Sequence, residues 1–224
     1  RGAAAVCAVS SFTAHLAEEA YPGVTPVVIP NGVDTAEYDP GTITVHEPPR
    51  VAFAGRFVEQ KNPAGVIHAL NEVKDLPWTC VMAGDGLLRP DVQALAERLG
   101  LGGRVSFPGW LTPAEVKEQF AGSDILFLPS LSEGLPVVGV QGMAMGLALL
   151  LSRAGGNPDL VDPPRNGRLF DPQDTAGFAS ALRAWLTDPD ELLAARKASR
   201  EMARTFSLDQ IVAKYEEVLT NASD

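Results

Sequence analysis

Glu133 and Gln141 are the first residues whose types and spacing could bind a ligand. A strand predicted over 124–129 leads into the loop SLSEGLP, and Pro136 at the end of that loop has the fixed φ of a first helical turn. The two residues are eight positions apart, a little over two helical turns, so both could face one ligand. A carboxylate accepts hydrogen bonds from sugar hydroxyls, and an amide that accepts and donates suits a diol such as a ribose.

Both residues also have a plainer interpretation. Glu133 could be a loop carboxylate in water, and Gln141 an amide on a helix surface. The neighbours of Gln141 in VVGVQGMAMG are nearly all apolar, and an amide in such a helix usually has a specific partner. A loop at the carboxyl end of a parallel strand, facing a helix N-terminus, is also where open α/β sheets bind ligands. The residues alone leave both interpretations open.

Two cations follow an earlier predicted strand, in the segment AGRFVEQKN at 54–62. Gly55 lets the backbone approach a ligand closely, Arg56 offers a planar fork of donors, and Lys61 is a mobile point charge. Two cations beside a helix N-terminus suit a diphosphate. A solvated loop with two surface cations fits the same spacing equally well.

Two further strand ends could border the same ligand. The Gly84-Asp85-Gly86 turn could form a nest of backbone amides, although a plain strand-to-helix turn is the commoner structure. The full dinucleotide fingerprint is absent, so NAD is not predicted and an NAD-type oxidoreductase is disfavoured. Trp110 follows a strand that ends in Pro108-Gly109, and its ring could border a planar base or anchor the core.

Other chemistries find no support in the sequence. The three histidines are scattered, and no HExxH pattern, cysteine pair or close acidic cluster predicts a metal site. No Gly-x-Ser-x-Gly nucleophile elbow is present. We expect no metal and no cofactor.

Composition narrows the partners. The chain of 224 residues has a net charge of −10 and no basic run, which argues against nucleic acid or an anionic membrane. No apolar run is long enough to span a bilayer, and a cytoplasmic location is expected. Cys7 and Cys80 lie in apolar runs and are expected to be buried free thiols.

The elements that would position these residues alternate regularly. Strands are predicted over 51–54, 78–83, 104–107, 125–128, 147–151 and 168–170, with helices over 63–73, 90–99, 112–120 and 136–145 between them. Most strands are continuous apolar runs, which indicates burial on both faces. The fold class is therefore α/β, a doubly wound, Rossmann-like parallel sheet.

The ends of the chain differ from this body. Strands are expected over 3–9 and 26–30 with a helix between them, and the polar, proline-containing stretch 34–49 reads as a linker. Near the carboxyl end, Ser207 and Gln210 form a capping-box pattern that opens a last helix with one apolar face. The chain begins at Arg1, which suggests an excised piece. We divide it into 1–45, 46–206 and 207–224.

The order of motifs resembles a known family. VIPNGVD, AGRFVEQKN, MAGDG, VSFPGWL, DILFLPSLSEGLP and AGGNPDLV are similar, in that order, to the carboxyl-terminal half of the retaining glycosyltransferases of family 4, which have the two-domain GT-B fold. The resemblance implies a donor half that binds a nucleotide-diphosphate sugar. It implies transfer of a hexose-type sugar to a hydroxyl acceptor, without a bound metal. Residues 1–45 would be the tail of the amino-terminal domain with the linker, and 207–224 a helix that crosses back to that domain.

The resemblance also assigns roles. Arg56 and Lys61 match the pair that contacts the diphosphate leaving group, and Glu133 matches the first glutamate of a Glu-x7-Glu motif near the donor sugar. Gln141 falls where the second glutamate, the usual ribose ligand, stands. The resemblance therefore implies a catalytic set of Arg56, Lys61 and Glu133. Together with other residues of the same segments, it implies a substrate-binding set of Gly55, Asp85, Trp110, Leu111, Ser130, Gly134, Leu135, Pro136 and Gln141.

Two departures from the family pattern matter. Gln141 lacks the charge of the usual glutamate, and Asn62 stands where family members carry glycine. The acceptor half, which would be this chain's own amino-terminal domain, is largely outside the sequence, so the piece alone is expected to be inactive. The alternatives are a degenerate, non-catalytic nucleotide-sugar-binding module and a GT-B-type nucleotide-sugar 2-epimerase.

Overall fold

A six-stranded parallel sheet forms the centre of the molecule. The computed structural model describes residues 3–221. The strands are β3 (Arg50–Ala54), β4 (Thr79–Ala83), β5 (Val105–Gly109), β6 (Ile125–Leu128), β7 (Ala148–Ser152) and β8 (Gly167–Phe170). Nearly all residues of β3, β4, β6 and β7 are buried, as their continuous apolar sequences require when helices cover both faces. The six strands predicted for this region are confirmed to within three residues at each end.

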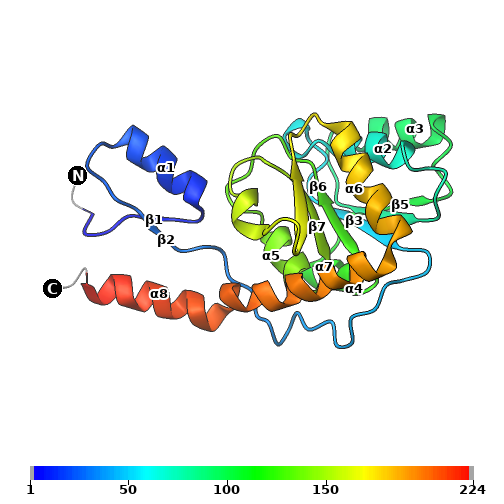
Figure 1. Cartoon of the computed structure of the whole chain (residues 1–224). Coiled ribbons are helices and arrows are strands. Elements are labelled where there is room, and N and C mark those ends of the chain that lie inside the picture. The colour runs from blue at the N-terminus through cyan, green and yellow to red at the C-terminus, as the bar shows by residue number, and fades with distance from the viewer. Residues whose placement is uncertain (1–2, 222–224) are drawn as a thin grey trace.

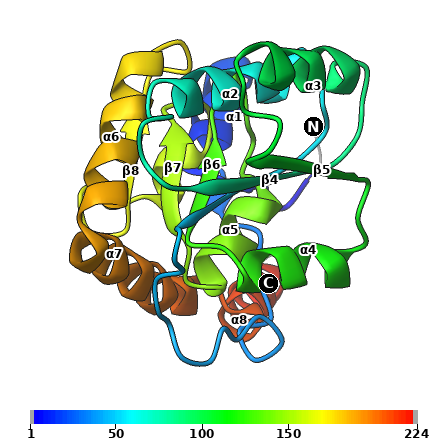
Figure 2. The same ribbon diagram turned by 90° about the vertical axis from the view of Figure 1, so that its right-hand side faces the viewer.

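Helices cover both faces of this sheet (Figure 2). One layer holds α2 (Pro63–Asn71), α3 (Arg89–Arg98) and α6 (Thr175–Thr187), and the other holds α4 (Pro113–Ala121), α5 (Val137–Ala144) and α7 (Pro189–Met202). Short 3₁₀ turns lie at Glu59–Lys61, Asn157–Leu160 and Ala203–Phe206. The predicted capping box of α4 is present, because Thr112 Oγ1 accepts from the Glu115 N–H at 3.3 Å and the Glu115 carboxylate accepts from the Thr112 N–H at 2.7 Å.

The strand order locates a binding crevice. The sheet runs β5-β4-β3-β6-β7-β8, so the chain moves outward in one direction from β3 and then returns to start again at β6. This is the doubly wound Rossmann order, and the predicted fold class is confirmed. Ligands of such sheets bind beyond the carboxyl ends of the strands where the order reverses, here between β3 and β6.

The amino-terminal part of the chain forms a second, much smaller sheet. β1 (Cys7–Ala8) and β2 (Val27–Val28) pair in parallel on either side of α1 (Ser11–Ala20), in a sheet separate from the six-stranded one (Figure 1). We call residues 7–28 the N-terminal unit.

Two predictions for the N-terminal unit are wrong. The strands expected over 3–9 and 26–30 each have only two residues, and both residues of β2 are exposed. Cys7 is exposed, whereas Cys80 is buried as predicted and burial raises its thiol pKa to about 12. The physical reason is that apolar runs predict burial only where other layers cover them, and a single helix, α1, covers these strands in part: Ala8 and Ile29 are buried, whereas Cys7, Val27 and Val28 are exposed.

The linker and the last helix tie the ends to the body. α8 (Leu208–Asn221) leaves the body on the side of the N-terminal unit, and a bridge between Val33 and Ser207 fastens its start (Figure 1). The fully buried Asp124 accepts hydrogen bonds from the backbone N–H groups of His46 and Arg50 and from the buried Arg196 guanidinium.

Within residues 3–221, no helix is both long and apolar enough to cross a membrane.

Candidate functional site

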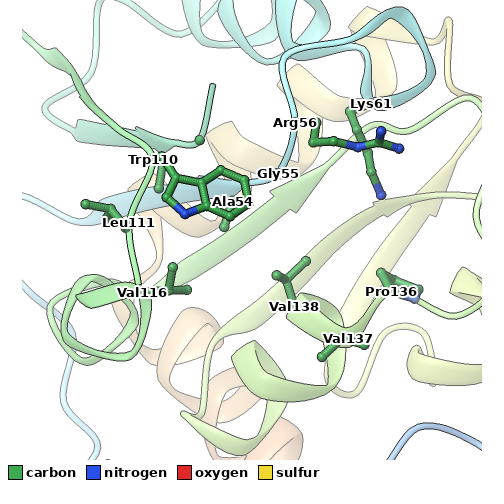
Figure 3. A pocket seen from close by; sticks show the side chains of 12 residues that line it. Ala54, Gly55, Arg56, Lys61, Trp110, Leu111, Val116, Pro136, Val137 and Val138 are labelled. Atoms are coloured by element: carbon green, nitrogen blue, oxygen red, sulfur yellow. The ribbon is translucent and has the colours of Figure 1, made fainter. Parts of the chain in front are cut away.

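A cavity of about 280 Å³ opens at the point where the strand order reverses. Its walls come from the carboxyl ends of β3 and β4, the segments that follow β5, and the start of α5. The lining residues are Ala54, Gly55, Arg56, Lys61, Ala83, Gly84, Trp110, Leu111, Val116, Pro136, Val137 and Val138. Figure 3 shows Arg56 and Lys61 together at one end of the cavity and Trp110, Leu111 and Val116 at the other.

The cationic end contains an ion pair. Lys61 Nζ lies 2.6 Å from Glu133 Oε1, although 72 residues separate the two in sequence. Glu133 is 7% exposed, so the interpretation of this residue as a carboxylate in open water is wrong. Arg56 is exposed and forms no ion pair among those found in residues 3–221. The sheet therefore presents one paired and one unpaired cation beside the cavity.

Asn62 ends the short turn that carries Lys61 and begins α2. It has φ 47° and ψ 50°, the left-handed conformation that asparagine adopts more readily than most other non-glycine residues. Its Oδ1 caps α2 by accepting from the Gly65 N–H at 3.2 Å, and its Nδ2 donates to the carbonyls of Pro129 and Pro172, each at 3.2 Å. The asparagine thus adopts the left-handed turn and connects it by three side-chain hydrogen bonds to α2, to the end of β6 and to the segment after β8.

Gly55 and Gly84 form the wall of the cavity between its cationic end and its apolar end. Gly84 has φ +129°, and a Cβ there would collide with the carbonyl oxygen of Gly55. The ends of β3 and β4 can therefore lie close together and offer bare backbone to a ligand. Asp85, which we predicted to bind substrate, is exposed beside this wall and outside the cavity lining, with Arg89 Nη1 3.7 Å from its carboxylate.

The N-terminus of α5 supplies a positive helix end. Pro136 is the N-cap residue, with no side-chain cap and no acidic residue in the first turn. Val137 and Val138 of that turn line the cavity. Backbone N–H groups at the start of a helix are unpaired within the helix and favour anions. The predicted start of this helix near Pro136 is confirmed.

The apolar end is built around an exposed ring. Trp110 is 73% exposed, so its interpretation as a core anchor is wrong. Leu111 and Val116 lie beside it in the cavity wall. A large, solvent-facing aromatic ring next to aliphatic side chains is a surface on which a planar heterocycle can stack.

Gln141 lies one turn further along α5 and has a partner from the linker. Its Nε2 donates to the hydroxyl of the buried Tyr38 at 2.9 Å, and burial raises the pKa of Tyr38. Gln141 is outside the cavity lining, whereas Glu133 pairs with Lys61. Glu133 and Gln141 are thus held by different partners.

The remaining predicted residues lie in the loop after β6. Pro136 lines the cavity, Gly134 is exposed, and Leu135 and Ser130 are buried. Ser130 accepts a hydrogen bond from Ser152 Oγ at its carbonyl oxygen, so it holds the loop to β7.

The expected binding set leaves out six lining residues, all small or aliphatic, of which only Gly84 was considered, as part of a backbone-amide nest: Ala54, Ala83, Gly84, Val116, Val137 and Val138. Four of them stand at strand ends or directly after Pro136, so the same strand-end rule could have found them. Among residues 3–221, no group of three or more His, Cys, Asp or Glu side chains could hold a metal ion.

Comparison of the chain with known proteins identifies its family. The family described as glycosyl transferases group 1 matches residues 34–202. A D-inositol 3-phosphate glycosyltransferase of Corynebacterium kroppenstedtii is 30% identical over 201 residues, covering 81% of this chain and 44% of the relative. A 2-deoxystreptamine glucosyltransferase of Streptomyces kanamyceticus is 30% identical over 178 residues, covering 76% of this chain and 46% of the relative. The chain therefore spans about half the length of the curated relatives it matches.

Solved structures share the fold. The C-terminal domain of a glycosyl transferase group 1 family protein from Francisella tularensis superposes with a TM-score of 0.72 at 21% identity, covering 79% of this chain and all of that domain. The Anabaena protein Alr3699/HepE, solved in complex with UDP, gives a TM-score of 0.85 at 23% identity, covering 97% of this chain and 64% of its own. The chain belongs to the group 1 glycosyl transferases, glycosyltransferase family 4, and its six-stranded body has the fold of their carboxyl-terminal GT-B domain.

Proposed function

We propose that this chain is the donor-binding half of a retaining glycosyltransferase that moves a hexose-type sugar from a nucleoside diphosphate to a hydroxyl acceptor. The observation that carries the proposal is the division of one cavity into a cationic end and an aromatic end at the strand-order reversal. A nucleoside diphosphate has the same division, an anionic diphosphate joined to a planar base. The complex of the Anabaena relative with UDP supports UDP as the first probe.

The cationic end would stabilise the leaving group. As the bond between the sugar and the diphosphate breaks, negative charge grows on the diphosphate, and Arg56, Lys61 and the α5 N-terminus would neutralise it. Donors aimed at a developing charge typically contribute about 3–4 kcal/mol each to transition-state stabilisation. Glu133, paired with Lys61 and 7% exposed, would orient both the lysine and the donor sugar.

The aromatic end would hold the nucleoside. The ring of Trp110 and the side chains of Leu111 and Val116 offer a stacking surface for the base. Gln141 donates its Nε2 to Tyr38, which leaves its Oε1 as an acceptor for a ribose hydroxyl. Such an amide gives a neutral ribose contact in place of a charged one.

Calorimetric titration with UDP, GDP and ADP tests the donor site. We expect millimolar or tighter binding of at least one diphosphate, and a loss of at least about tenfold in affinity for Arg56→Ala and for Lys61→Ala. Lys74→Ala is the matched control, because Lys74 is an exposed cation outside the cavity lining. A folded chain that binds none of the three nucleotides at millimolar concentration would contradict the proposal.

Catalysis requires a separate test on the longer protein. Since the chain spans about half of its curated relatives, we propose that turnover needs an acceptor-binding domain in addition to it. Transfer by the complete protein that Glu133→Ala abolishes, with nucleotide binding retained, would support an enzyme. Nucleotide binding without transfer to any acceptor or to water would instead favour a degenerate, non-catalytic binding module. The neutral Gln141 is the residue that supports this alternative.

A further inference from the structure

The loop that carries Glu133 is held by the N-terminal unit and the residues just after it. Asn31 Nδ2 donates to the carbonyl of Leu135 at 2.8 Å, although 104 residues separate them. Val9 lies close to Gly134, with its Cγ2 3.8 Å from the position of a Cβ on that glycine. A segment outside the six-stranded body therefore touches the donor loop directly.

A second contact lies next to the first. The Asp159 carboxylate accepts from the Ser11 N–H at 2.7 Å, at the first residue of α1. Ser10, the N-cap of α1, is fully buried, and its side chain packs against Gly156. The amino end of α1 is therefore fastened to the turn that follows β7.

That turn supports the donor loop from its other side. A Cβ on Gly155 would collide with the carbonyl of Glu133, and one on Gly156 would collide with the carbonyl of Gly134. The Gly156 N–H donates to the Glu133 carbonyl at 3.4 Å. The backbone of Glu133 and Gly134 thus lies between the glycine turn and the N-terminal unit, and a shift of either side moves the carboxylate that pairs with Lys61.

We propose that Asn31 is a positioning residue for the donor loop, and that it and Asp159 form a latch through which the N-terminal unit and nucleotide binding influence each other. The inference rests on the proposed function, since it concerns the same cavity. Asn31 fixes the carbonyl of Leu135 directly before the N-cap Pro136, so the latch also sets the direction of the α5 N-terminus. Any such coupling is reciprocal: a bound nucleoside diphosphate holds the unit more firmly against the body.

Two measurements on the 224-residue chain test the latch. The first is calorimetric titration with UDP of the wild type, Asn31→Ala and Asn31→Asp. The aspartate keeps the size of the side chain but replaces the N–H donor with an oxygen that repels the Leu135 carbonyl. We expect about a five- to tenfold loss of UDP affinity for alanine and at least as large a loss for aspartate.

The second measurement is hydrogen–deuterium exchange of the peptide covering 131–138. A positioning role predicts faster exchange in this peptide while exchange in β3, β6 and β7 and the melting temperature stay unchanged. Asp34→Ala is the matched control, because Asp34 accepts from two backbone N–H groups, at Ala36 and Glu37, and is not in the latch. This control should keep both the UDP affinity and the loop exchange of the wild type.

The outcomes separate this inference from the proposed function. Wild-type UDP affinity in Asn31→Ala, or a loss accompanied by faster exchange throughout the body, would overturn the positioning role. If the wild-type chain binds no nucleotide, the proposed function fails, and the exchange rate of 131–138 in Asn31→Ala still decides whether the latch exists.

Discussion

The six-stranded body and the N-terminal unit are built from similar apolar segments but differ in how far they bury them. Leu149, Leu150 and Leu151 of β7 are 0% exposed, whereas Val27 of β2 is 43% exposed. α1 likewise shows Phe12 and Leu16 to solvent, at 40% and 45% exposure. A βαβ arrangement alone therefore does not make a core. The body closes both faces of its sheet with helices, and the N-terminal unit has one helix and two residues per strand.

The largest effect that would test this difference is expected at Asp124. Asp124→Ala removes the carboxylate that pairs with Arg196, which is 3% exposed, and leaves two backbone N–H groups without their acceptor. We expect a loss of about 3–5 kcal/mol in the free energy of unfolding, measured by urea denaturation. Glu19→Ala in the N-terminal unit removes a carboxylate from an exposed pair with His15 and should leave the midpoint unchanged. Comparable losses in both variants would contradict the contrast.

A matched pair of leucines gives the next effect. Leu150→Ala empties a fully buried position in β7 and should cost about 3 kcal/mol of unfolding free energy. Leu16→Ala in α1 should change it by less than about 0.5 kcal/mol, because Leu16 is 45% exposed. Thermal and denaturant unfolding of both variants measure this. If Leu16→Ala proved as damaging as Leu150→Ala, the N-terminal unit would have to belong to the cooperative core.

A pair of glycines separates backbone strain from close packing. Gly155 and Gly23 both have positive φ, at +57° and +90°, so alanine is strained at either position. Only at Gly155 would the new Cβ meet a neighbour, the Glu133 carbonyl, whereas no atom lies within 4 Å at Gly23. We expect Gly155→Ala to lose about 2–3 kcal/mol together with UDP binding, and Gly23→Ala to lose less and to bind normally. Retained UDP affinity in Gly155→Ala would show that the loop tolerates movement.

The smallest effect is expected at an exposed ion pair of the body. The Arg183 guanidinium, hydrogen-bonded to Asp75, lowers the pKa of that carboxyl below its ordinary value of 3.8. A lowered folded-state pKa gives stability that is present above pH 3.8 and lost as the pH falls through the folded-state value. The small stability difference between wild type and Asp75→Asn should therefore shrink below pH 4, in urea titrations at a series of pH values. A difference as large as that at Asp124 would mean that pairing, rather than burial, sets the stability of these carboxylates.

The same contrast explains how much could be predicted from the sequence. Continuous apolar runs located β3, β4, β6 and β7, because these strands are buried on both faces, whereas the edge strands β5 and β8 are partly exposed and were predicted from their place in the strand-helix alternation. The same rule failed for residues 3–9 and 26–30, since a run of apolar residues carries no information on whether a second layer exists in the described chain. Burial is a property of the neighbours as much as of the segment.

The site shows a similar limit. The rule that ligands bind at strand ends, together with the family resemblance, singled out Arg56, Lys61 and Glu133, and the structure brings Lys61 and Glu133 into contact. The contact of Gln141 with Tyr38, 103 residues away, was not predicted. Tyr38 lies in a linker whose sequence has no periodic pattern. The contact between Tyr38 and α5 therefore depends on tertiary packing, which the local sequence does not predict.

The latch residue also carries a chemical liability. Asn31 is followed by Gly32, and because glycine has no side chain of its own, its backbone nitrogen can attack the asparagine amide carbonyl, which releases ammonia and leaves a cyclic succinimide. Asn62 is protected from the same reaction, because Pro63 has no backbone N–H. Hydrolysis of that succinimide by water gives aspartate and isoaspartate, so stored protein would lose the N–H donor that holds Leu135 and gain a carboxylate in its place. Peptide mapping by mass spectrometry alongside UDP titration would follow that ageing in one preparation.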